Sequence, residues 1–583
     1  MNKIKYSIAI AGFAFLSATA ASAANYIYGN TTNDGNQTMN DARNWFEIDS
    51  FDGLNEYSYD YLTRVSETNT KFLPTASDNL LVKNLNQSSF DGVDKYNPAG
   101  VLASGSGNVY NIRSQSFGFP ANSEGPHGNL FEINNMTFSV DPNYVLNTDP
   151  QTTAQINNVE KGFHWRPQGA DGNIKIHGTL ALEKNAKLTI QGDHPTNGAW
   201  TSVDIGKINF TTIAGSKTQL NLTSHIKETR IGVMDNGSGV LVANGTTSTI
   251  GNGTGLYTDL AGMANSVVYF GNFVAETGSD MHLKGGDFYF VGEATFNGNL
   301  IALHNQNTAI TGNMTNNGTF DFRLGTYTGT MTNTGTFNMS NIEGPSYYTN
   351  FNGKLINSGT ATFSRGIFTG EVENTGTVRL QRPDHPDAPL LSVAKMNANV
   401  TNRSSFTARS DAEFKGSFKA IGISSVSSFT GTSKADLSNE TLHLQNAKFY
   451  VGESAKMLLS NTDFIYDFDT AGGFSAILEF GAVSNVDTLS VILGQDFGFM
   501  NIEEGYYDLI RFLDGGMYSS LAALIGETLN FQDKSTYDIF EGTFLSNSSG
   551  VFGIEFVLIP EPSTYAAIFG ILALALVAYR RRK

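Results

Sequence analysis

A block of eleven residues with alternating apolar and polar positions recurs in the middle of the chain. It begins at Gly312, Gly329, Gly353 and Gly370 and reads Gly-x-apolar-x-Asn-x-Gly-Thr-apolar-x-apolar. Alternation with a period of two predicts strands with one buried face and one solvated face. The Asn-x-Gly segment between the two apolar stretches predicts turn residues with positive φ. Each block is therefore predicted to be two strands around a turn, with its aromatic side chains directed into the core.

The spacing of the blocks predicts how they pack. Successive blocks start 17, 24 and 17 residues apart, and looser copies begin at Gly172 and Gly292. A unit this short cannot bury its own apolar face, so the units must stack. This period is typical of one coil of a parallel β-helix, in which the recurring asparagines form a ladder at one corner. Antiparallel hairpins are the alternative because Asn-Gly turns also suit them, and antiparallel pairing of the segments at Gly318 and Gly335 would establish that arrangement.

We predict an all-β fold: a right-handed parallel β-helix with N- and C-terminal β caps and a short apolar C-terminal helix. Residues 151–455 form the repeat region, and residues 456–558 form a C-terminal β region with longer strands. Residues 24–150 contain Trp45, a Pro-x-Ala-x-Asp turn at 74–78 and an apolar strand. This pattern resembles the entry segment of autotransporter-passenger-like β-helical proteins, and we expect it to cap the first coil.

The N-terminus has the three parts of a secretory signal peptide. Lys3 and Lys5 are followed by an apolar stretch and then by the small residues Ala21-Ser22-Ala23. We predict that residues 1–23 direct export and are removed by signal peptidase after Ala23.

The C-terminal segment, residues 559–583, joins a Pro-Glu-Pro motif, an apolar run and a basic cluster. The run from Tyr565 to Tyr579 has fifteen residues, or about 22 Å of helix, whereas a hydrocarbon core is about 30 Å thick. The segment resembles the PEP-CTERM sorting signal of Gram-negative bacteria. The resemblance implies retention in the inner membrane by a short transmembrane helix, processing by an exosortase-type enzyme, delivery to the cell surface or the medium, and a link to extracellular polysaccharide and biofilm matrix. The sorting residues it implies are Pro560, Glu561, Pro562, Arg580, Arg581 and Arg582.

Composition narrows the possible chemistry. The chain has no cysteine, which excludes disulfides, thiolate zinc sites and a cysteine nucleophile. The formal net charge is −17. Removal of the six basic residues of the two terminal segments leaves 31 basic residues against 54 acidic ones, a net charge near −23, or −22 when Glu561 is also removed. Such a surface repels phosphates and other polyanions, so no nucleic-acid partner is expected.

Few residues suggest a catalytic, cofactor or metal site, and we predict none of the three. Gly215-Ser216-Lys217-Thr218 is similar to the end of a phosphate loop but lacks the glycine before the lysine. Asp235-Asn236-Gly237 and Asn33-Asp34-Gly35 offer oxygen ligands for Ca²⁺, although a turn is the better interpretation. His177 and His282 are predicted to face solvent.

Paired acids keep an enzymatic alternative open. Asp467 and Asp469 lie two residues apart on one predicted strand, with Asp463 nearby, and Glu503-Glu504 is a second pair. Parallel β-helices also serve as scaffolds for polysaccharide lyases and glycosidases, which use paired carboxylates or carboxylate-bound Ca²⁺. With 54 acids in the chain, solvated carboxylates are the preferred interpretation.

The leading hypothesis is an exported structural or adhesion protein of the cell surface or extracellular matrix without catalytic activity. One alternative is a polysaccharide lyase or glycosidase that uses Asp467 or Asp469. Another is a glycan- or ice-binding module, and a regular exposed threonine ladder would favour ice. The repeat threonines that would form this ladder are Thr319, Thr336, Thr360 and Thr377.

Overall fold

The structure of the protein is a computed structural model. It describes residues 25–28, 45–48, 63–64, 79–84, 109–115, 130–140, 162–168, 173–183, 186–190, 201–212, 217–223, 225–260, 266–302, 308–340, 349–381, 394–452, 454–458, 462–469, 478–480, 489–493, 499–512, 522–533, 535–547, 550–560 and 562–582. The predicted signal peptide (1–23), the Asn33-Asp34-Gly35 segment and the turn at 74–78 lie outside these residues.

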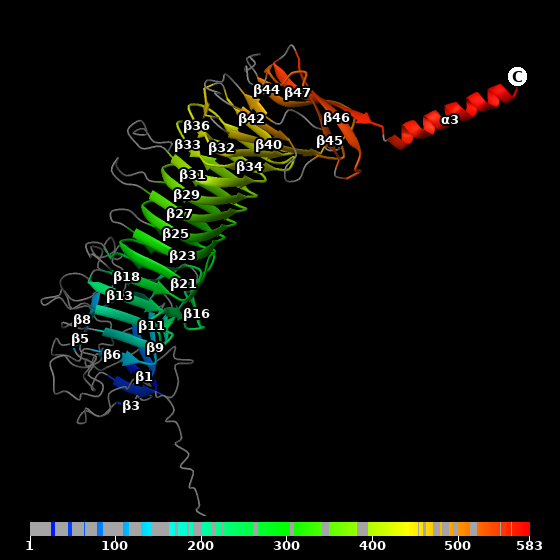
Figure 1. The fold of residues 1–583 in the computed structure, drawn as a ribbon. Helices are drawn as coiled ribbons and strands as arrows, with labels where there is room; N and C mark the ends of the chain where they lie inside the picture. The colour runs from blue at the N-terminus through cyan, green and yellow to red at the C-terminus, as the bar shows by residue number, and fades with distance from the viewer. Residues whose placement is uncertain are drawn as a thin grey trace, which may run out of the picture.

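Two stacks of strands run along an elongated rod, from the N-terminal strands at one end to the C-terminal strands at the other (Figure 1). The first sheet contains β1 (Asn25–Tyr28), β2 (Trp45–Ile48), β3 (Thr63–Arg64), β4 (Asn79–Asn84), β6 (Leu130–Ile133), β7 (Asn135–Val140), β9 (Asn173–Glu183), β11 (Thr201–Phe210), β13 (Ile226–Ile231), β16 (Thr247–Ile250), β18 (Val267–Phe270), β19 (Asn272–Ala275), β21 (Gly286–Phe296), β23 (Thr308–Asn316), β25 (Gly325–Asn333), β27 (Thr349–Asn357), β29 (Gly366–Asn374), β31 (Ala394–Asn402), β33 (Glu413–Lys415), β34 (Phe418–Ile421), β36 (Lys434–Asp436), β37 (Thr441–Gln445), β39 (Lys456–Leu458), β40 (Thr462–Asp469), β42 (Leu489–Leu493) and β43 (Phe499–Met500).

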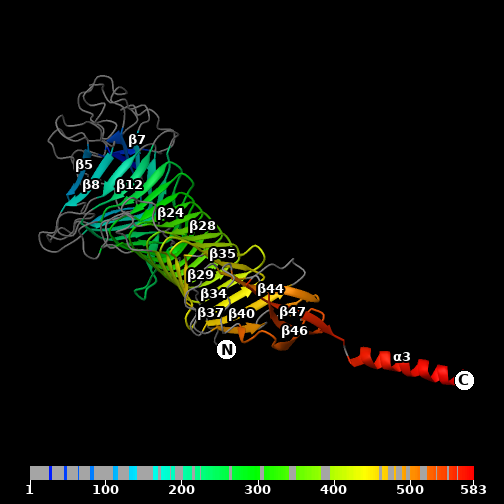
Figure 2. The same cartoon turned by 90° about the horizontal axis from the view of Figure 1, so that it is seen from above.

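The second sheet lies across the core from the first, and its strands follow one another along the rod (Figure 2). It contains β5 (Val109–Gln115), β8 (Gly162–Gln168), β10 (Lys187–Ile190), β12 (Thr218–Leu222), β17 (Thr254–Thr258), β20 (Asp280–Leu283), β22 (Asn299–Ala302), β24 (Thr319–Phe322), β26 (Thr336–Met339), β28 (Thr360–Phe363), β30 (Thr377–Leu380), β32 (Ser405–Ala408), β35 (Val426–Phe429), β38 (Lys448–Val451), β41 (Leu478–Phe480), β44 (Gly505–Phe512), β45 (Thr528–Gln532), β46 (Ile539–Ser546) and β47 (Val551–Ile559). A separate hairpin consists of β14 (Val233–Asp235) and β15 (Leu241–Ala243).

Parallel pairing of successive blocks confirms the predicted β-helix. Thr319 is in register with Thr336, and Gly329 is in register with Gly353, both between parallel strands. The segments that precede and follow Gly335 therefore stack on the neighbouring coil, and the hairpin alternative is wrong. Each coil of the repeat consists of one long strand of the first sheet and one four-residue strand of the second sheet.

The repeat extends one coil further than the glycine spacing predicted. β29 and β31 pair in parallel, with Gly370 opposite Ala398 and Asn374 opposite Asn402. This copy has Ala398 and Ser404 where the others have glycine, so its marker residues are missing while its asparagine remains.

Stacked aromatic rings fill the core of the coils. The ring of Phe351 lies between those of Tyr327 and Phe368, with centroid distances of 4.6 and 4.7 Å. All three side chains are fully buried, which confirms that the repeat aromatics face inward. The hydroxyl of Tyr327 is within hydrogen-bond distance of the carbonyl oxygens of Gly312 (2.9 Å) and Thr330 (3.1 Å), and burial raises the pKa of Tyr327.

The predicted asparagine ladder is present at the corner between the two sheets. The Nδ2 atom of each of the first four asparagines donates to Oδ1 of the asparagine in the next coil, at 2.7, 2.7, 2.8 and 2.7 Å. The same Nδ2 groups also contact backbone carbonyls of the turns, such as Thr360 O and Thr377 O. Each side chain is at most 1% exposed, so the ladder satisfies polar groups that water does not reach. Its members are Asn316, Asn333, Asn357, Asn374 and Asn402.

The ladder has a different neighbour at each end. At one end, Asn402 Nδ2 donates to the hydroxyls of Ser425 and Ser427, at 3.1 and 3.0 Å. At the other end, Asn316 Oδ1 is buried and has no hydrogen-bond partner among the described residues. The preceding coil places Phe296 in register with Asn316, so the ladder starts where an aromatic residue replaces the asparagine.

The repeat glycines permit close approach of successive backbones. A Cβ atom on Gly353 would lie 1.9 Å from Gly329 O, and one on Gly335 would lie 2.1 Å from Gly318 O. The prediction of positive φ in the Asn-x-Gly turns is wrong, because Gly335 and its counterparts have no positive φ. Positive φ occurs instead at the bend inside the long strand, for example 143° at Gly329.

Antiparallel strands occur at both ends of the rod. β1 pairs with β2, and β2 with β3, in antiparallel register. At the other end β44, β47, β46 and β45 are successive antiparallel neighbours. The parallel coils do not stop at residue 456, the predicted start of the C-terminal region, but continue as far as the β41–β44 pair. The described strands thus include the predicted caps.

One helix, α3 (Pro562–Arg581), follows β47 after two residues and extends away from the rod (Figure 1). Its apolar side chains are exposed, including Phe569 and Leu574. No helix among the described residues has the combination of length and apolarity needed to cross a membrane.

The ladder predicts a large stability difference between two asparagines of the same coil. Replacement of Asn357 with alanine leaves Asn333 Nδ2 and Asn374 Oδ1 without an amide partner in the core, so we expect a loss of about 2–4 kcal/mol. The exposed Asn352 serves as the control, and its replacement should change stability by less than about 0.5 kcal/mol. Chemical denaturation followed by circular dichroism measures both, and similar midpoints for the two variants would contradict this role of the ladder.

Candidate functional site: an uncharged polar strip

One outer column of the first sheet carries only threonine and asparagine over five coils. We call this column the polar strip. Alternation along β25 explains its position, because Tyr327 points into the core and Thr328 points to solvent. At about 4.8 Å per coil the strip is about 19 Å long. Its members, in register, are Thr311, Thr328, Asn352, Thr369 and Asn397.

The side chains of the polar strip have no hydrogen-bond partner among the described residues. All but Thr311 are exposed. The adjacent outward column, two residues earlier in each strand, is also uncharged over four coils and contains Ala309, Thr326, Asn350 and Ile367. The asparagines of the buried ladder use their amides within the protein, whereas these outward hydroxyls and amides remain available to solvent or to a ligand.

Two stacked tyrosines close one end of the polar strip. Tyr289 is in register with Thr311 on one side and with Tyr269 on the other. The two rings have centroids 5.2 Å apart and planes inclined by 22°. Because the rings stack along the rod, the face of Tyr289 that does not contact Tyr269 is directed toward Thr311. An apolar ring face therefore adjoins a row of unpaired polar groups.

Charged residues lie beyond the tyrosines. Arg230 is in register with Tyr269 and with Asp204, and its Nε atom donates to Glu228 Oε1 at 2.5 Å. Burial raises the pKa of Asp204, while Arg230 and Lys175 act in the opposite direction. Burial, and then the charge of Glu228, raise the pKa of Tyr269, so this phenol is neutral at physiological pH.

The repeat threonines form a regular ladder on the opposite face of the rod. Thr319, Thr336, Thr360 and Thr377 are in register in the second sheet, but all four are only partly exposed. The neighbouring outward column includes Asp321, which pairs with Arg323 at 2.7 Å, and the exposed Arg379. This face is therefore less exposed than the polar strip and carries charges.

One of the two histidines that were predicted to face solvent is partly buried. His177 is exposed as predicted, but His282 is half-buried with its ring centroid 4.4 Å from that of Tyr257. Burial lowers the pKa of His282, and Asp280 opposes this change.

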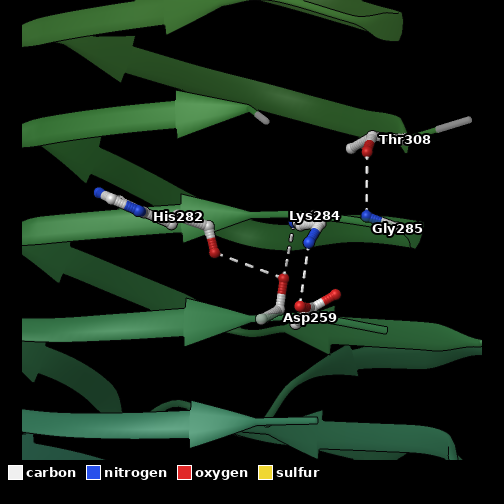
Figure 3. Close-up of polar contacts among 6 residues, drawn as sticks. Asp259, His282, Lys284, Gly285 and Thr308 are labelled. Atoms are coloured by element: carbon white, nitrogen blue, oxygen red, sulfur yellow. Dashed lines mark hydrogen bonds and ion pairs between the residues drawn. The ribbon is translucent and has the colours of Figure 1, made fainter. Parts of the chain in front are cut away.

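Polar contacts next to His282 join successive coils (Figure 3). The Nζ atom of Lys284 lies 3.0 Å from Asp259 Oδ2, and the backbone N–H of Gly285 donates to the hydroxyl of Thr308 at 3.2 Å. These residues serve as contacts between coils, so we do not include them in the candidate site.

The acids proposed for catalysis do not form an exposed pair. Asp467 is fully buried, and its Oδ2 atom lies 2.6 Å from His443 Nε2. Asp463 is exposed on the same strand, and the side chain of Asp469 lies outside the described residues. The expectation of a solvated carboxylate at 467 is thus wrong. His443 lies 24 residues from its partner, so no local sequence pattern predicts the pair.

The remaining candidate segments serve as turns or strands. Asp235 Oδ1 accepts hydrogen bonds from the backbone N–H groups of Gly237 (2.7 Å) and Gly239 (3.0 Å), which confirms the turn interpretation. Lys217 precedes a strand, not the helix that a phosphate loop requires. Glu504 accepts a hydrogen bond from the backbone of Leu558. Within the described residues no group of three or more His, Asp or Glu side chains is placed to hold a metal ion.

Comparison with known proteins gives little further information. No protein-family model matches the chain, and no curated protein matches it. The crystal structure of the Haemophilus influenzae Hap adhesin is similar with 11% sequence identity and a TM-score of 0.19, and the match covers 92% of this chain and 71% of that chain. The function must therefore be inferred from the residues of this chain.

The two acids of β40 predict different responses to mutation. Replacement of Asp467 with alanine leaves buried His443 without its carboxylate, so we expect a loss of about 3 kcal/mol. Replacement of exposed Asp463 with alanine should change stability by less than about 0.5 kcal/mol. Thermal and chemical unfolding measure both, and a neutral Asp467→Ala variant would contradict a structural role for the pair.

Proposed function

We propose that the protein is an exported structural or adhesive component of the cell surface or extracellular matrix, and that its rod presents the polar strip to neutral extracellular polysaccharide. The observation that carries this proposal is the strip itself. Exposed hydroxyl and amide groups without protein partners repeat along a rigid stack, and Tyr289 offers an apolar ring face at one end. Sugars need both features, because their hydroxyls form hydrogen bonds and their C–H faces pack on aromatic rings.

Charge favours a neutral glycan over an acidic one. The mature chain has a net charge near −23, so long-range forces oppose the approach of a polyanion. The polar strip and the column that contains Ala309 have no charged residue over four coils, whereas the column on the other side of the strip carries the ion pair of Lys354 and Glu371. A neutral chain lying along the rod meets an equivalent set of groups every 4.8 Å or so, and such repetition adds many weak contacts.

The catalytic and ice-binding alternatives receive less support. The lyase or glycosidase hypothesis relied on Asp467, which lies buried against His443. An ice-binding face needs a regular array of exposed threonines. The threonine ladder at Thr336 is partly buried, and the polar strip has asparagine at two of its five positions, Asn352 and Asn397.

We further propose that the chain follows the export route implied by its two ends. Signal peptidase would remove residues 1–23, and an exosortase-type enzyme would act near the Pro-Glu-Pro motif after α3 and Arg580–Arg582 hold the chain at the inner membrane. The geometry of the motif supports this route. Pro560 is exposed and lies between the last strand of the cap and the first residue of α3, so a processing enzyme can reach it without unfolding the rod.

The polar strip predicts which variants lose glycan binding. Tyr289→Ala removes the aromatic ring, and Thr328→Val/Thr369→Val removes two hydroxyls. Each variant should bind a neutral glucan such as laminarin about tenfold more weakly. Thr362→Val makes one threonine-to-valine change on the opposite face and should bind like the original protein. Calorimetry or affinity electrophoresis measures the difference. Equal losses in all three variants, or binding to alginate alone, would contradict the role of the strip.

The sorting segment predicts how the chain is processed. Replacement of Pro560 and Pro562 with alanine should leave the C-terminal residues attached and retain the chain in the membrane fraction. Mass spectrometry of fractionated cells gives the C-terminus, and the Thr362→Val variant is the matched control. Normal release of the Pro560→Ala/Pro562→Ala chain would argue against exosortase-type processing while leaving the glycan result unaffected.

A further inference from the structure

The C-terminal cap ends in a strand with one free edge. β45 pairs with β46 and with no other described strand. Thr528, Leu529, Asn530 and Gln532 are all exposed, and Leu529 is 50% exposed. The backbone N–H and C=O groups on the outer side of β45 are thus accessible to another strand.

β45 lacks the features by which natural edge strands prevent pairing. Charged residues, prolines and bulges are the usual protection. Thr528–Gln532 contains no charge and no proline, and its pairing with β46 runs without a register shift.

Exposed apolar side chains also concentrate at this end of the rod. Outside α3, the described residues include twelve large hydrophobic side chains that are exposed, and seven of them belong to residues 505–559. Exposed apolar side chains of this kind favour contact with another molecule. The seven are Tyr506, Ile525, Leu529, Tyr537, Ile539, Val557 and Leu558.

We propose that two copies of the chain join end to end through antiparallel pairing of their β45 strands. The strand is complementary to itself when the twofold axis passes through Asn530. Leu529 then lies opposite Phe531 of the partner subunit on the core side. On the outer side, Asn530 meets its own copy, and two facing amides related by the twofold axis can each donate to the other. A twofold interface of this kind closes after two copies.

This pairing goes beyond the proposed function, because it doubles the length of the rod whatever the rod binds. Five residues on each side bury a small area, so the dimer is weak and depends on concentration. Each mature copy has a net charge near −23, and Glu527 of one copy approaches Asp533 of the partner subunit. Added salt screens this repulsion, so dimerisation should strengthen as ionic strength rises.

Charge placed on the twofold axis tests the register directly. Sedimentation velocity of the exported protein, in mild detergent where α3 is retained, should show dimers that increase with concentration and with salt. Asn530→Lys and Asn530→Glu should each be monomeric because like charges meet at the axis. A 1:1 mixture of the two variants should form dimers again because opposite charges meet. Asn209→Lys, on an exposed position of β11, is the control and should dimerise normally.

Three sedimentation results would overturn the proposal: a monomer at every concentration, dimers that persist in Asn530→Lys, or a mixture of the two variants that stays monomeric. Binding of the monomer to phospholipid vesicles through Leu529 would assign the apolar cap to a lipid surface and would also overturn it. The glycan measurement is independent, because Thr328→Val/Thr369→Val should lose laminarin binding and still dimerise.

Discussion

The buried hydrogen bonds between asparagines determine how the coils of this protein stack. A parallel β-helix must satisfy polar groups at its corners without water, and it must do so again in every coil. An amide side chain donates and accepts at once, so one residue type can continue the pattern indefinitely without introducing charge. All four amide bonds run in the same direction, from Asn316 toward Asn402. The row therefore has an unused acceptor at one end and serine hydroxyls at the other.

The ladder also explains why coils of different length fit the same stack. Its members are separated by 17, 24, 17 and 28 residues, yet the Nδ2–Oδ1 distances stay between 2.7 and 2.8 Å. The extra residues fall between the end of a short strand and the start of the next long strand, as between Met339 and Thr349. Register is thus maintained by the corner and by backbone contact at glycines such as Gly353, while the opposite corner tolerates insertion.

Residue spacing was sufficient to predict the inward aromatics and the asparagine ladder, because both repeat at fixed offsets within one coil. It was insufficient for the coil at Ala398, whose marker glycines are replaced. It also placed positive φ in the wrong turn, because glycines such as Gly335 are required for close approach to the next backbone. The period of two predicts that Thr328 faces outward. Whether its hydroxyl has a partner depends on side chains in neighbouring coils, as does the burial of Asp467 against His443.

The stacking of coils in register, which organises the interior of the rod, also explains the pattern of residues on its outer surface. Every coil repeats the same backbone path, so any outward position becomes a column, and its chemistry is multiplied by the number of coils. Inward amides are paired because an unpaired one costs stability, whereas outward ones such as Asn352 face water and carry no such penalty. The columns can therefore vary without changing the fold, and they are charged near Arg230 and neutral near Thr328. The ends of the rod differ from the coils between them, because the last strand of a stack has a neighbouring strand on one side only. At β45 the described chain supplies none, so a second molecule is the simplest way to complete the sheet.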